Sequence, residues 1–430
     1  MSRGDTIYAL SSGHPPAAIA VVRISGPAAA AALSAVAGDL PEPRRAAVRE
    51  LRHPENGEVL DRGLTLFFPG PNSATGDDIA ELHLHGGRAV VAGVLDSLDT
   101  LGGLRAAEPG EFTRRAFENG RIDLTEAEGL ADLLAAETQS QRRASLALAG
   151  GALSRRVADW QARLLGLSAG LEAALDFSDE GDVGEELPQG WRTSLRSLAA
   201  EIDVALRSPT AERLRDGVRV VIAGPPNAGK SSLLNWLVGR RAAITSAIAG
   251  TTRDLVEAPT AIGGHPFLLI DTAGLRESDE EIEAEGIELA RRSLDAADLV
   301  LWLGPPADCP DPVRSILVQS KIDKPGAARD PEAEIGVSSE TGEGMDGLVV
   351  MLIERARSLL PQEGEVAINA RHRQALAAAL RHLEEAEQTG DPLIASEALR
   401  LARVELDRVT GRAGVEDMLD ALFGSFCIGK

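Results

Sequence analysis

The chain has 430 residues and a formal net charge of −22 at pH 7, because 66 acidic residues outnumber 44 basic ones. Its 44% hydrophobic and 26% charged residues are typical of a folded globular protein. The acidic balance argues against a broad basic face for nucleic acid, and 3% aromatic residues leave few side chains on which bases could stack. We therefore expect a partner to hold most of any nucleic acid on which this protein works.

The sequence shows no feature of a membrane or secreted protein. No apolar run approaches the roughly 18 residues of a membrane helix, and the first residues lack the apolar stretch of a signal peptide. Cys309 and Cys427 build no disulfide framework and no CxxC zinc motif. We expect a cytoplasmic protein without membrane contact, and a structural rather than a nucleophilic role for Cys427, because no neighbour in the sequence would activate its thiol.

Lysine is rare, since four of the 44 basic residues are lysines and 40 are arginines. Arginine evidently serves wherever a generic cation is enough, so a retained lysine indicates a position that needs a compact ammonium. By this argument Lys230, Lys321 and Lys430 are candidate functional residues, whereas Lys324 is interpreted as an ordinary loop residue.

The N-terminal part of the chain mixes short apolar runs with turns, which indicates α/β structure. Residues 18–26 are typical of a strand, and Pro27 with the alanines after it is typical of a helix start. Residues 78–87 alternate like a strand and end in a glycine turn. His83 and His85 in this strand have no third candidate ligand, so a plain strand is favoured over a metal site.

Long amphipathic helices replace this pattern from about residue 119. Apolar residues recur there at spacings of three and four, as on the buried face of a helix. The two stripes consist of Leu153, Val157, Trp160, Leu164, Leu167, Leu171 and Leu175, and of Trp191, Leu195, Leu198, Ile202 and Leu206. The acidic residues 179–188 between them are interpreted as a solvated connector.

The order of elements predicts that one domain is inserted into another. Residues 217–360 alternate strands with helices, as in a parallel sheet, and residues 371–423 are helical again. The predicted fold class is α/β and α: an N-terminal α/β domain is followed by a helical domain that a P-loop domain interrupts. The predicted segments are 1–118, 119–215, 216–365 and 366–430.

A phosphate-binding motif opens the inserted domain. Gly-x4-Gly-Lys-Ser runs from Gly224 to Ser231, after an apolar strand and before an amphipathic helix, which is the context that the motif requires. Glycines let backbone amides turn toward the phosphates, and the helix N-terminus adds its positive dipole. Lys230 would reach the β/γ-phosphates, and the Ser231 hydroxyl would bind Mg²⁺.

The other parts of a GTPase follow in order. In GTTRD (250–254), Thr252 is placed where a switch loop supplies a Mg²⁺ ligand. Strand residues 266–274 end in Asp-x-x-Gly, where Asp271 can hold the metal through water and the Gly274 amide can sense the γ-phosphate.

Recognition of guanine is predicted at two further strand ends. Residues 315–323 end in Lys-x-Asp, and Asp323 could accept from the guanine N1–H and 2-amino groups, while the Lys321 stem lies along the base plane. Backbone amides of Ser338 and Ser339 could approach the guanine oxygen.

Two residues depart from the common small-GTPase arrangement. Ser320 stands where an Asn usually contacts the base and braces the loop, so we expect weaker nucleotide affinity. Leu275 stands where many GTPases have a Gln that orients water, so hydrolysis needs another group. The acidic residues 276–286 offer candidates.

These motifs closely resemble the family of tRNA-modification GTPases called MnmE or TrmE, over nearly the whole chain. Besides the G-domain motifs, the resemblance rests on RISGP near the N-terminus, PNSATGDDIAELHLHGG (71–87), EPGEFTRRAFENGRIDLTEAEGLADL (108–133) and the terminal FCIGK (426–430).

The resemblance implies an N-terminal domain that binds folate and dimerises, and a helical domain interrupted by the G domain. It implies a K⁺-activated GTPase that works with the flavoprotein MnmG in a hetero-oligomer. The pair would convert C5 of the wobble uridine of certain tRNAs to an aminomethyl or carboxymethylaminomethyl derivative. The one-carbon donor would be 5-formyl- or 5,10-methylene-tetrahydrofolate, and MnmG would hold most of the tRNA.

The family's functional residues are carried over position by position. Glu283 would orient the attacking water, with one more solvated acid as the alternative interpretation. Folate would contact Arg23, Glu81, Arg121 and Lys430, although Arg23 could also be an edge cation paired with Glu81. The K⁺ ligands would be Asn227, Ser246, Ile248 and Thr251. The GTP-binding residues would be Asn227, Ala228, Gly229, Lys230, Ser231, Ser232, Ser246, Ala247, Ile248, Ala249, Gly250, Thr251, Thr252, Asp271, Thr272, Ala273, Gly274, Lys321, Asp323, Ser338 and Ser339.

Two other functions remain open at this point. A GTP-binding switch in ribosome assembly would make no change to RNA, but such proteins usually carry a basic domain that this chain lacks. An ATP-dependent P-loop enzyme is disfavoured by the Lys-x-Asp motif at 321–323.

Overall fold

The computed structural model describes residues 4–177, 190–239, 256–271, 291–325, 329–362, 365–413, 416–424 and 426–430. The chain forms two compact units, Met1–Ala131 with Thr410–Lys430 and Asp132–Val409, and each is described by itself. Every helix within the described ranges is too short or too polar to cross a membrane.

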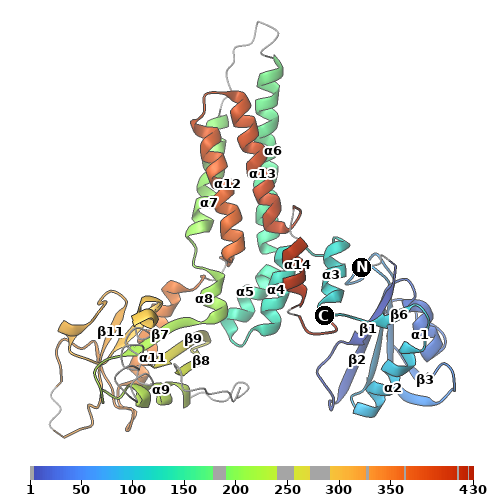
Figure 1. Ribbon diagram of the computed structural model, residues 1–430, viewed down its shortest axis with the longest axis horizontal. Helices are drawn as coiled ribbons and strands as arrows, with labels where there is room; N and C mark the ends of the chain where they lie inside the picture. Colours follow the sequence, from blue (N-terminus) through green and yellow to red (C-terminus); the bar gives the residue numbers. More distant parts are fainter. Residues whose placement is uncertain are drawn as a thin grey trace, which may run out of the picture. The chain divides into compact units, whose positions relative to one another are not determined.

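The first unit is built on a sheet in the order β3-β4-β5-β2-β1-β6, in which only the β1–β6 pair is parallel. Alternation along β2 and β5 buries one face under two helices, α1 and α2 (Figure 1). The strands predicted at 18–26 and 78–87 are confirmed as β2 and β5, and the first helix begins two residues after Pro27. The bounds are β1 Thr6–Leu10, β2 Ile19–Ser25, α1 Ala29–Ala37, β3 Ala47–Arg52, β4 Val59–Phe68, β5 Ile79–His85, α2 Arg88–Asp99 and β6 Leu104–Ala106.

A buried ion-pair cluster fixes helix α3 (Glu111–Glu118) against this sheet. Glu111 is 2% exposed and accepts hydrogen bonds from Arg105 and from the Glu108 amide. Asp5, just before β1, accepts from both Arg105 and Arg115 at 2.7 Å. These bonds join the segment before β1, strand β6 and the start of α3. They thereby fix the position of Phe112, the second residue of α3.

The C-terminal residues pack in the same unit. Helices α4 (Leu124–Ala135) and α14 (Glu416–Gly424) share an apolar cluster that includes Leu124, Phe423 and Phe426. Gly429 lies so close to β1 that a Cβ atom would sit 2.2 Å from the Leu10 carbonyl oxygen, and its φ of +94° also favours glycine. This contact explains the glycine in the terminal FCIGK.

Four long helices of the second unit lie alongside one another (Figure 1). They are α6 Ala152–Phe177, α7 Trp191–Arg207, α12 Ala370–Gln388 and α13 Pro392–Thr410. The two predicted stripes are confirmed, since their side chains, together with residues after the inserted domain, form one buried core. The predicted insertion is confirmed because this core draws on both sides of residues 217–360.

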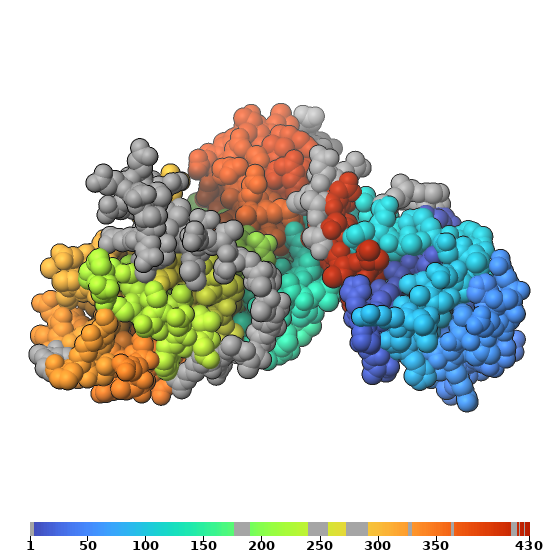
Figure 2. All heavy atoms as spheres, turned by 60° about the horizontal axis from the view of Figure 1, so that its bottom comes forward, coloured from blue at the N-terminus to red at the C-terminus, as the bar shows by residue number. Residues whose placement is uncertain are grey.

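The inserted domain contains a second sheet in the order β12-β11-β10-β7-β9-β8. Only β8 is antiparallel to its neighbour. Figure 2 shows the segments coloured yellow-green to orange as one contiguous body. The bounds are β7 Val218–Ala223, α9 Lys230–Gly239, β8 Val256–Ile262, β9 His265–Asp271, β10 Leu299–Trp302, a 3-10 turn Pro306–Asp308, β11 Ser315–Gln319, β12 Ile335–Gly336 and α11 Met345–Leu359.

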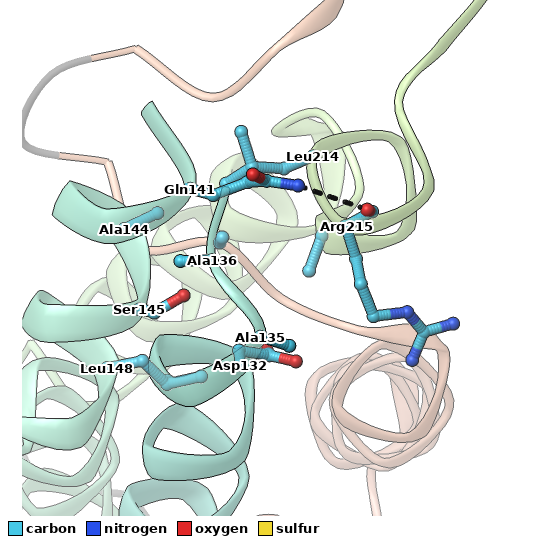
Figure 3. A pocket seen from close by; sticks show the side chains of 11 residues that line it. Asp132, Ala135, Ala136, Gln141, Ala144, Ser145, Leu148, Leu214 and Arg215 are labelled. Atoms are coloured by element: carbon cyan, nitrogen blue, oxygen red, sulfur yellow. Dashed lines mark hydrogen bonds between the residues drawn. The ribbon is translucent and has the colours of Figure 1, made fainter. Parts of the chain in front are cut away.

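Helix α5 (Gln139–Ala149) joins this sheet to the helices. A capping box between Thr138 and Gln141 begins the helix, and Ser140 donates from its amide and its hydroxyl to the Gly264 carbonyl in the β8–β9 turn. Gln141 also donates to the Arg215 carbonyl in α8 (Ala211–Asp216) at 3.2 Å, beside a cavity of about 80 Å³ (Figure 3). The hairpin that ends at Asp271 is thus tied to the helical part at its other end.

The Glu111 cluster makes a prediction about acid stability. Burial alone would raise the pKa of the Glu111 carboxyl, but hydrogen bonds from Arg105 and the Glu108 amide hold it below its ordinary value of 4.5. Because the folded pKa is the lower one, this stabilisation is present above pH 4.5 and is lost as pH falls through the folded pKa. Glu111→Gln should therefore cost about 2 kcal/mol at pH 7, the scale of a hydrogen bond to a charged group, and less in acid.

Hydrogen exchange of the β1 amides at pH 7 and at lower pH measures this loss. Glu118→Gln on the same helix is the control, because the Glu118 pair with Arg114 is half-exposed and should contribute little. Equal exchange in wild type and Glu111→Gln at pH 7 would contradict the structural role of the cluster.

Candidate functional site

The predicted nucleotide-binding residues that the structure describes lie at one edge of the second sheet. Strands β7, β9, β11 and β12 run parallel, so their carboxyl ends meet at the same edge. Asp271 ends β9, and the loops that follow the other three strands contain the P-loop, the 320–323 segment and Ser338. In open α/β sheets this edge is where ligands bind.

The P-loop holds its own lysine. Lys230, the first residue of α9, is buried, and its Nζ donates to the carbonyl oxygens of Gly224 at 3.1 Å and Pro225 at 3.0 Å. A side chain at Gly224, whose φ is +149°, would meet the Leu303 backbone at 3.0 Å. The loop backbone therefore positions the ammonium directly at the N-terminus of α9, where an anion is favoured.

Two oxygen ligands suitable for a magnesium ion lie together beside the P-loop. The Ser231 hydroxyl donates to Asp271 Oδ2 at 2.6 Å, and Asp271 is 3% exposed at the end of β9. Among the described residues no three His, Cys, Asp or Glu side chains gather as a metal cluster. The donor set nevertheless fits Mg²⁺, which is usually bound through one or two protein oxygens with phosphate and water as further ligands.

The loop after β11 is tied to the P-loop by two side chains. The Ser320 hydroxyl donates to the Ala228 carbonyl at 2.6 Å, and the Lys321 ammonium donates to the Asn227 carbonyl. Asn227 and Lys321 both have positive φ, at 62° and 58°. The Ser320 hydroxyl therefore braces this loop where an Asn amide usually does. The weaker nucleotide affinity expected from Ser320 stays a prediction. The loss of a direct contact with the base stays a prediction.

Asp323 is held as an acceptor. A hydrogen bond from the Ser338 hydroxyl, with a further one from its own backbone amide, holds the pKa of the Asp323 carboxyl below its ordinary value. The Ser338 amide donates to the Glu343 carbonyl at 2.9 Å, so that amide is already used. The contacts predicted between the guanine oxygen and the amides of Ser338 and Ser339 stay predictions, and the Ser338 amide would have to give up this bond to make one.

Several predicted residues lie outside the described residues, and their roles stay predictions. They are Ser246, Ala247, Ile248, Ala249, Gly250, Thr251, Thr252, Thr272, Ala273, Gly274 and Glu283.

The predicted folate residues Arg23 and Glu81 lie opposite each other on β2 and β5 of the first unit. Arg23 donates from Nε at 3.0 Å and from Nη2 at 2.8 Å to the same carboxylate oxygen, Oε1. Its guanidinium also lies 5.8 Å from the ring centre of Phe112. The alternative interpretation of Arg23 was an edge cation paired with Glu81: the pairing is observed, whereas the edge position is wrong, because β2 and β5 are interior strands of the sheet.

This face of the sheet fits a planar heterocycle with N–H donors. Leu64, Leu66 and Val21 surround the ion pair on the face that α1 and α2 do not cover. Arg121 follows α3 and Lys430 ends the chain, both in the same unit. No hydrogen bond or ion pair among the described residues links either of them to the Arg23–Glu81 pair, so their assignment stays a prediction.

Sequence reasoning missed His83 as part of this group. It was weighed only as a metal ligand, whereas its Nε2 lies 3.1 Å from the second oxygen of Glu81. The strand alternation contained the signal, since residues 81, 83 and 85 share one face of β5.

Comparisons with known proteins cover the whole chain. Residues 6–121 match the family described as "GTP-binding protein TrmE N-terminus", and residues 124–427 match "MnmE helical domain". Two relatives are named "tRNA modification GTPase MnmE". The one from Rhizorhabdus wittichii is 58% identical over 100% of this chain and 97% of its own, and the one from Erythrobacter litoralis is 57% identical over 99% and 100%.

A solved structure of the G domain of the T. maritima FeoB iron transporter is similar to part of the chain. It is 26% identical with a TM-score of 0.24, and the match covers 32% of this chain and 98% of that one. At this TM-score it adds nothing to the argument about the fold.

The brace made by Ser320 is tested by nucleotide affinity. Ser320→Ala should weaken GDP binding roughly tenfold, or about 1.4 kcal/mol, because the Ala228 carbonyl loses its donor and the P-loop its tie. Ser320→Asn should bind at least as tightly as wild type, since an amide can donate in place of the hydroxyl. Titration with a fluorescent GDP analogue measures both.

Ser358→Ala serves as the matched control, because that hydroxyl bonds only within helix α11 on an exposed turn. Wild-type affinity in Ser320→Ala would show that the brace does not contribute to binding.

Proposed function

Since the chain belongs to the MnmE family, also named TrmE, we propose that it is a GTP hydrolase that acts in tRNA modification. One observation carries the hydrolase part of the proposal. A single sheet edge brings together the loop that holds Lys230, the Ser231–Asp271 oxygens and the Lys321–Asp323 pair. These groups are suited to phosphate, to Mg²⁺ and to guanine, respectively.

Selection of guanine follows from the chemistry of Asp323. An ionised carboxylate only accepts hydrogen bonds, and guanine presents two adjacent N–H donors where adenine presents none. Asp323 is in that form at neutral pH, as an ordinary aspartate would be, and its lowered pKa keeps it ionised further into acid. The stem of Lys321 spans from this loop to the Asn227 carbonyl, and this contact supports its proposed role of lying along the base plane.

For hydrolysis we propose two cations and one acid. Ser231 and Thr252 would hold Mg²⁺ with Asp271 beside them, and Asn227, Ser246, Ile248 and Thr251 would hold K⁺. These cations, when bound, neutralise the charge that develops on the phosphates. Glu283 would orient the attacking water, which is needed because Leu275 cannot do so.

The finer function follows from the family resemblance and the first unit. We propose that the protein is a homodimer that works with MnmG on C5 of the wobble uridine. A one-carbon tetrahydrofolate would bind at Arg23, Glu81, Arg121 and Lys430, and MnmG would hold most of the tRNA. The net charge of −22 supports that division of labour. The predicted domain boundaries at 118, 215 and 365 belong to this proposal.

Glu283→Ala tests the assignment of the catalytic acid. In KCl it should slow GTP hydrolysis roughly 10²- to 10⁴-fold while GTP affinity stays nearly unchanged, because the proposed role exists only in the transition state. Steady-state hydrolysis and nucleotide titration together give both quantities. Wild-type hydrolysis should also be faster in KCl than in NaCl at equal ionic strength.

Glu281→Ala is the matched control, since it removes a neighbouring acid from the same run and should hydrolyse GTP at the wild-type rate. A loss in Glu283→Ala confined to binding, or an equal loss in Glu281→Ala, would remove Glu283 from its role. Equal wild-type rates in the two salts would contradict the K⁺ site.

A further inference from the structure

Three side chains form a hydrogen-bonded row on the face of the first sheet that α1 and α2 do not cover. The register pairs Arg23 with Glu81, and the next residue on the same face of β5 is His83. His83 Nε2 lies 3.1 Å from Glu81 Oε2, while both Arg23 bonds go to Oε1. Since an ionised carboxylate has no proton to give, His83 Nε2–H is the donor in this contact.

The two partners of Glu81 bind different oxygens of its carboxylate, Arg23 at Oε1 and His83 at Oε2. A carboxylate offers about four lone-pair directions. Arg23 fills two of them at Oε1 and so holds that oxygen. The bond from His83 holds the second oxygen, so that donors at both oxygens together set the plane of the carboxylate. About one lone pair, on Oε2, then remains for a ligand.

The environment makes this second bond important. The Glu81 side chain is 15% exposed, so burial opposes its charge. Burial alone would raise the pKa of the Glu81 carboxyl, yet hydrogen bonds from His83 and Arg23 hold it below its ordinary value. Exposed or half-buried apolar side chains of Leu64, Leu66 and Val21 flank the row and would exclude water around a bound ring.

We infer that His83 is a positioning residue for the reduced-folate site: it donates to Glu81 Oε2 and turns the carboxylate so that one oxygen lone pair meets an N–H of the bound heterocycle. The inference rests on the proposed folate role of Arg23 and Glu81. It adds a third residue to that site and assigns it an orientation function.

His85 supplies a matched control on the same strand. It lies two residues further along the same face of β5, but its Nδ1 pairs with Asp61 at 2.8 Å rather than with Glu81. Its side chain is 76% exposed. Removing His85 therefore takes away an imidazole without touching the row.

The experiment is calorimetric titration of the intact chain with 5-formyl-tetrahydrofolate. Wild type should bind, and Arg23→Ala should bind at least tenfold more weakly. His83→Leu should also lose roughly tenfold, the effect of one hydrogen bond to a charged group. His83→Gln, which can still donate to Oε2, should stay within about threefold of wild type, as should His85→Ala. Thermal melting confirms that each variant is folded.

A second measurement separates orientation from general packing. The pKa of the Glu81 carboxyl, followed by carbon NMR, should rise in His83→Leu and stay in place in His83→Gln and His85→Ala. Wild-type affinity in His83→Leu, or an equal loss in the Leu and Gln variants, overturns the inference while the proposed folate function stands. Absence of binding by wild type overturns the proposed folate function, and the inference with it.

Discussion

The hydrogen bond between the Ser231 hydroxyl and the Asp271 carboxylate joins the first turn of α9 to the end of β9, and the nucleotide edge is organised around it. It exists because β7 and β9 pair in parallel with Ile222 opposite Asp271, so the strand that leads into the P-loop ends beside the strand that carries the acid. The base-contacting loop is then added through the Asn227 and Ala228 carbonyls. The groups proposed to contact phosphate, Mg²⁺ and base are thus joined to one another by hydrogen bonds within the protein, and such preorganisation lowers the cost of ordering a binding site.

The β8–β9 hairpin connects the nucleotide edge with the helical part of the unit, because Asp271 lies at one end of the hairpin and its turn is bonded to α5. Its turn accepts two hydrogen bonds from Ser140, and Gly263 in that turn lies so close to Ile353 that any side chain would collide with it. The hydrogen bond from Gln141 to the Arg215 carbonyl fixes α8, the short helix that leads into β7, to α5 in the same way. These hydrogen bonds and close contacts link the β8–β9 turn, which lies just before the start of β9, to α5 and α8.

In the first unit, the two faces of the sheet have different surroundings. Its helices cover one face of the sheet, and the Glu111 cluster holds α3 so that Phe112 lies beside Arg23. The other face keeps a charged row among apolar neighbours, a composition suited to a planar polar ligand. An acidic chain with two such sites is consistent with a partner that supplies the contacts to RNA.

Much of the fold and of the nucleotide site could be predicted from the sequence, because local periodicity and motif spacing depend on residues close in sequence. The two helix stripes, the strands β2 and β5, and the P-loop between a strand and a helix all follow from such patterns. Ser320 shows the limit: its residue type predicted a lost amide, but only the fold brings its hydroxyl to the Ala228 carbonyl, 92 positions away. The Glu111 cluster likewise depends on chain segments that are distant in sequence, since Arg105 lies 100 residues from Asp5. The contact of His83 with Glu81, by contrast, joins two residues on one face of β5 and could have been found from the strand alternation.

The central claim is that the carboxyl edge of the second sheet is a guanine-nucleotide site. Competition of GTP and of ATP against a fluorescent GDP analogue, in the presence of Mg²⁺, tests it most directly. The account predicts that GTP displaces the analogue at a concentration at least roughly a hundredfold lower than ATP, or about 3 kcal/mol of discrimination, because adenine leaves the Asp323 carboxylate without a donor. It also predicts that Asp323→Asn reduces the ratio between the ATP and GTP concentrations needed to displace the analogue. Displacement by ATP at the same concentration as GTP would contradict the account.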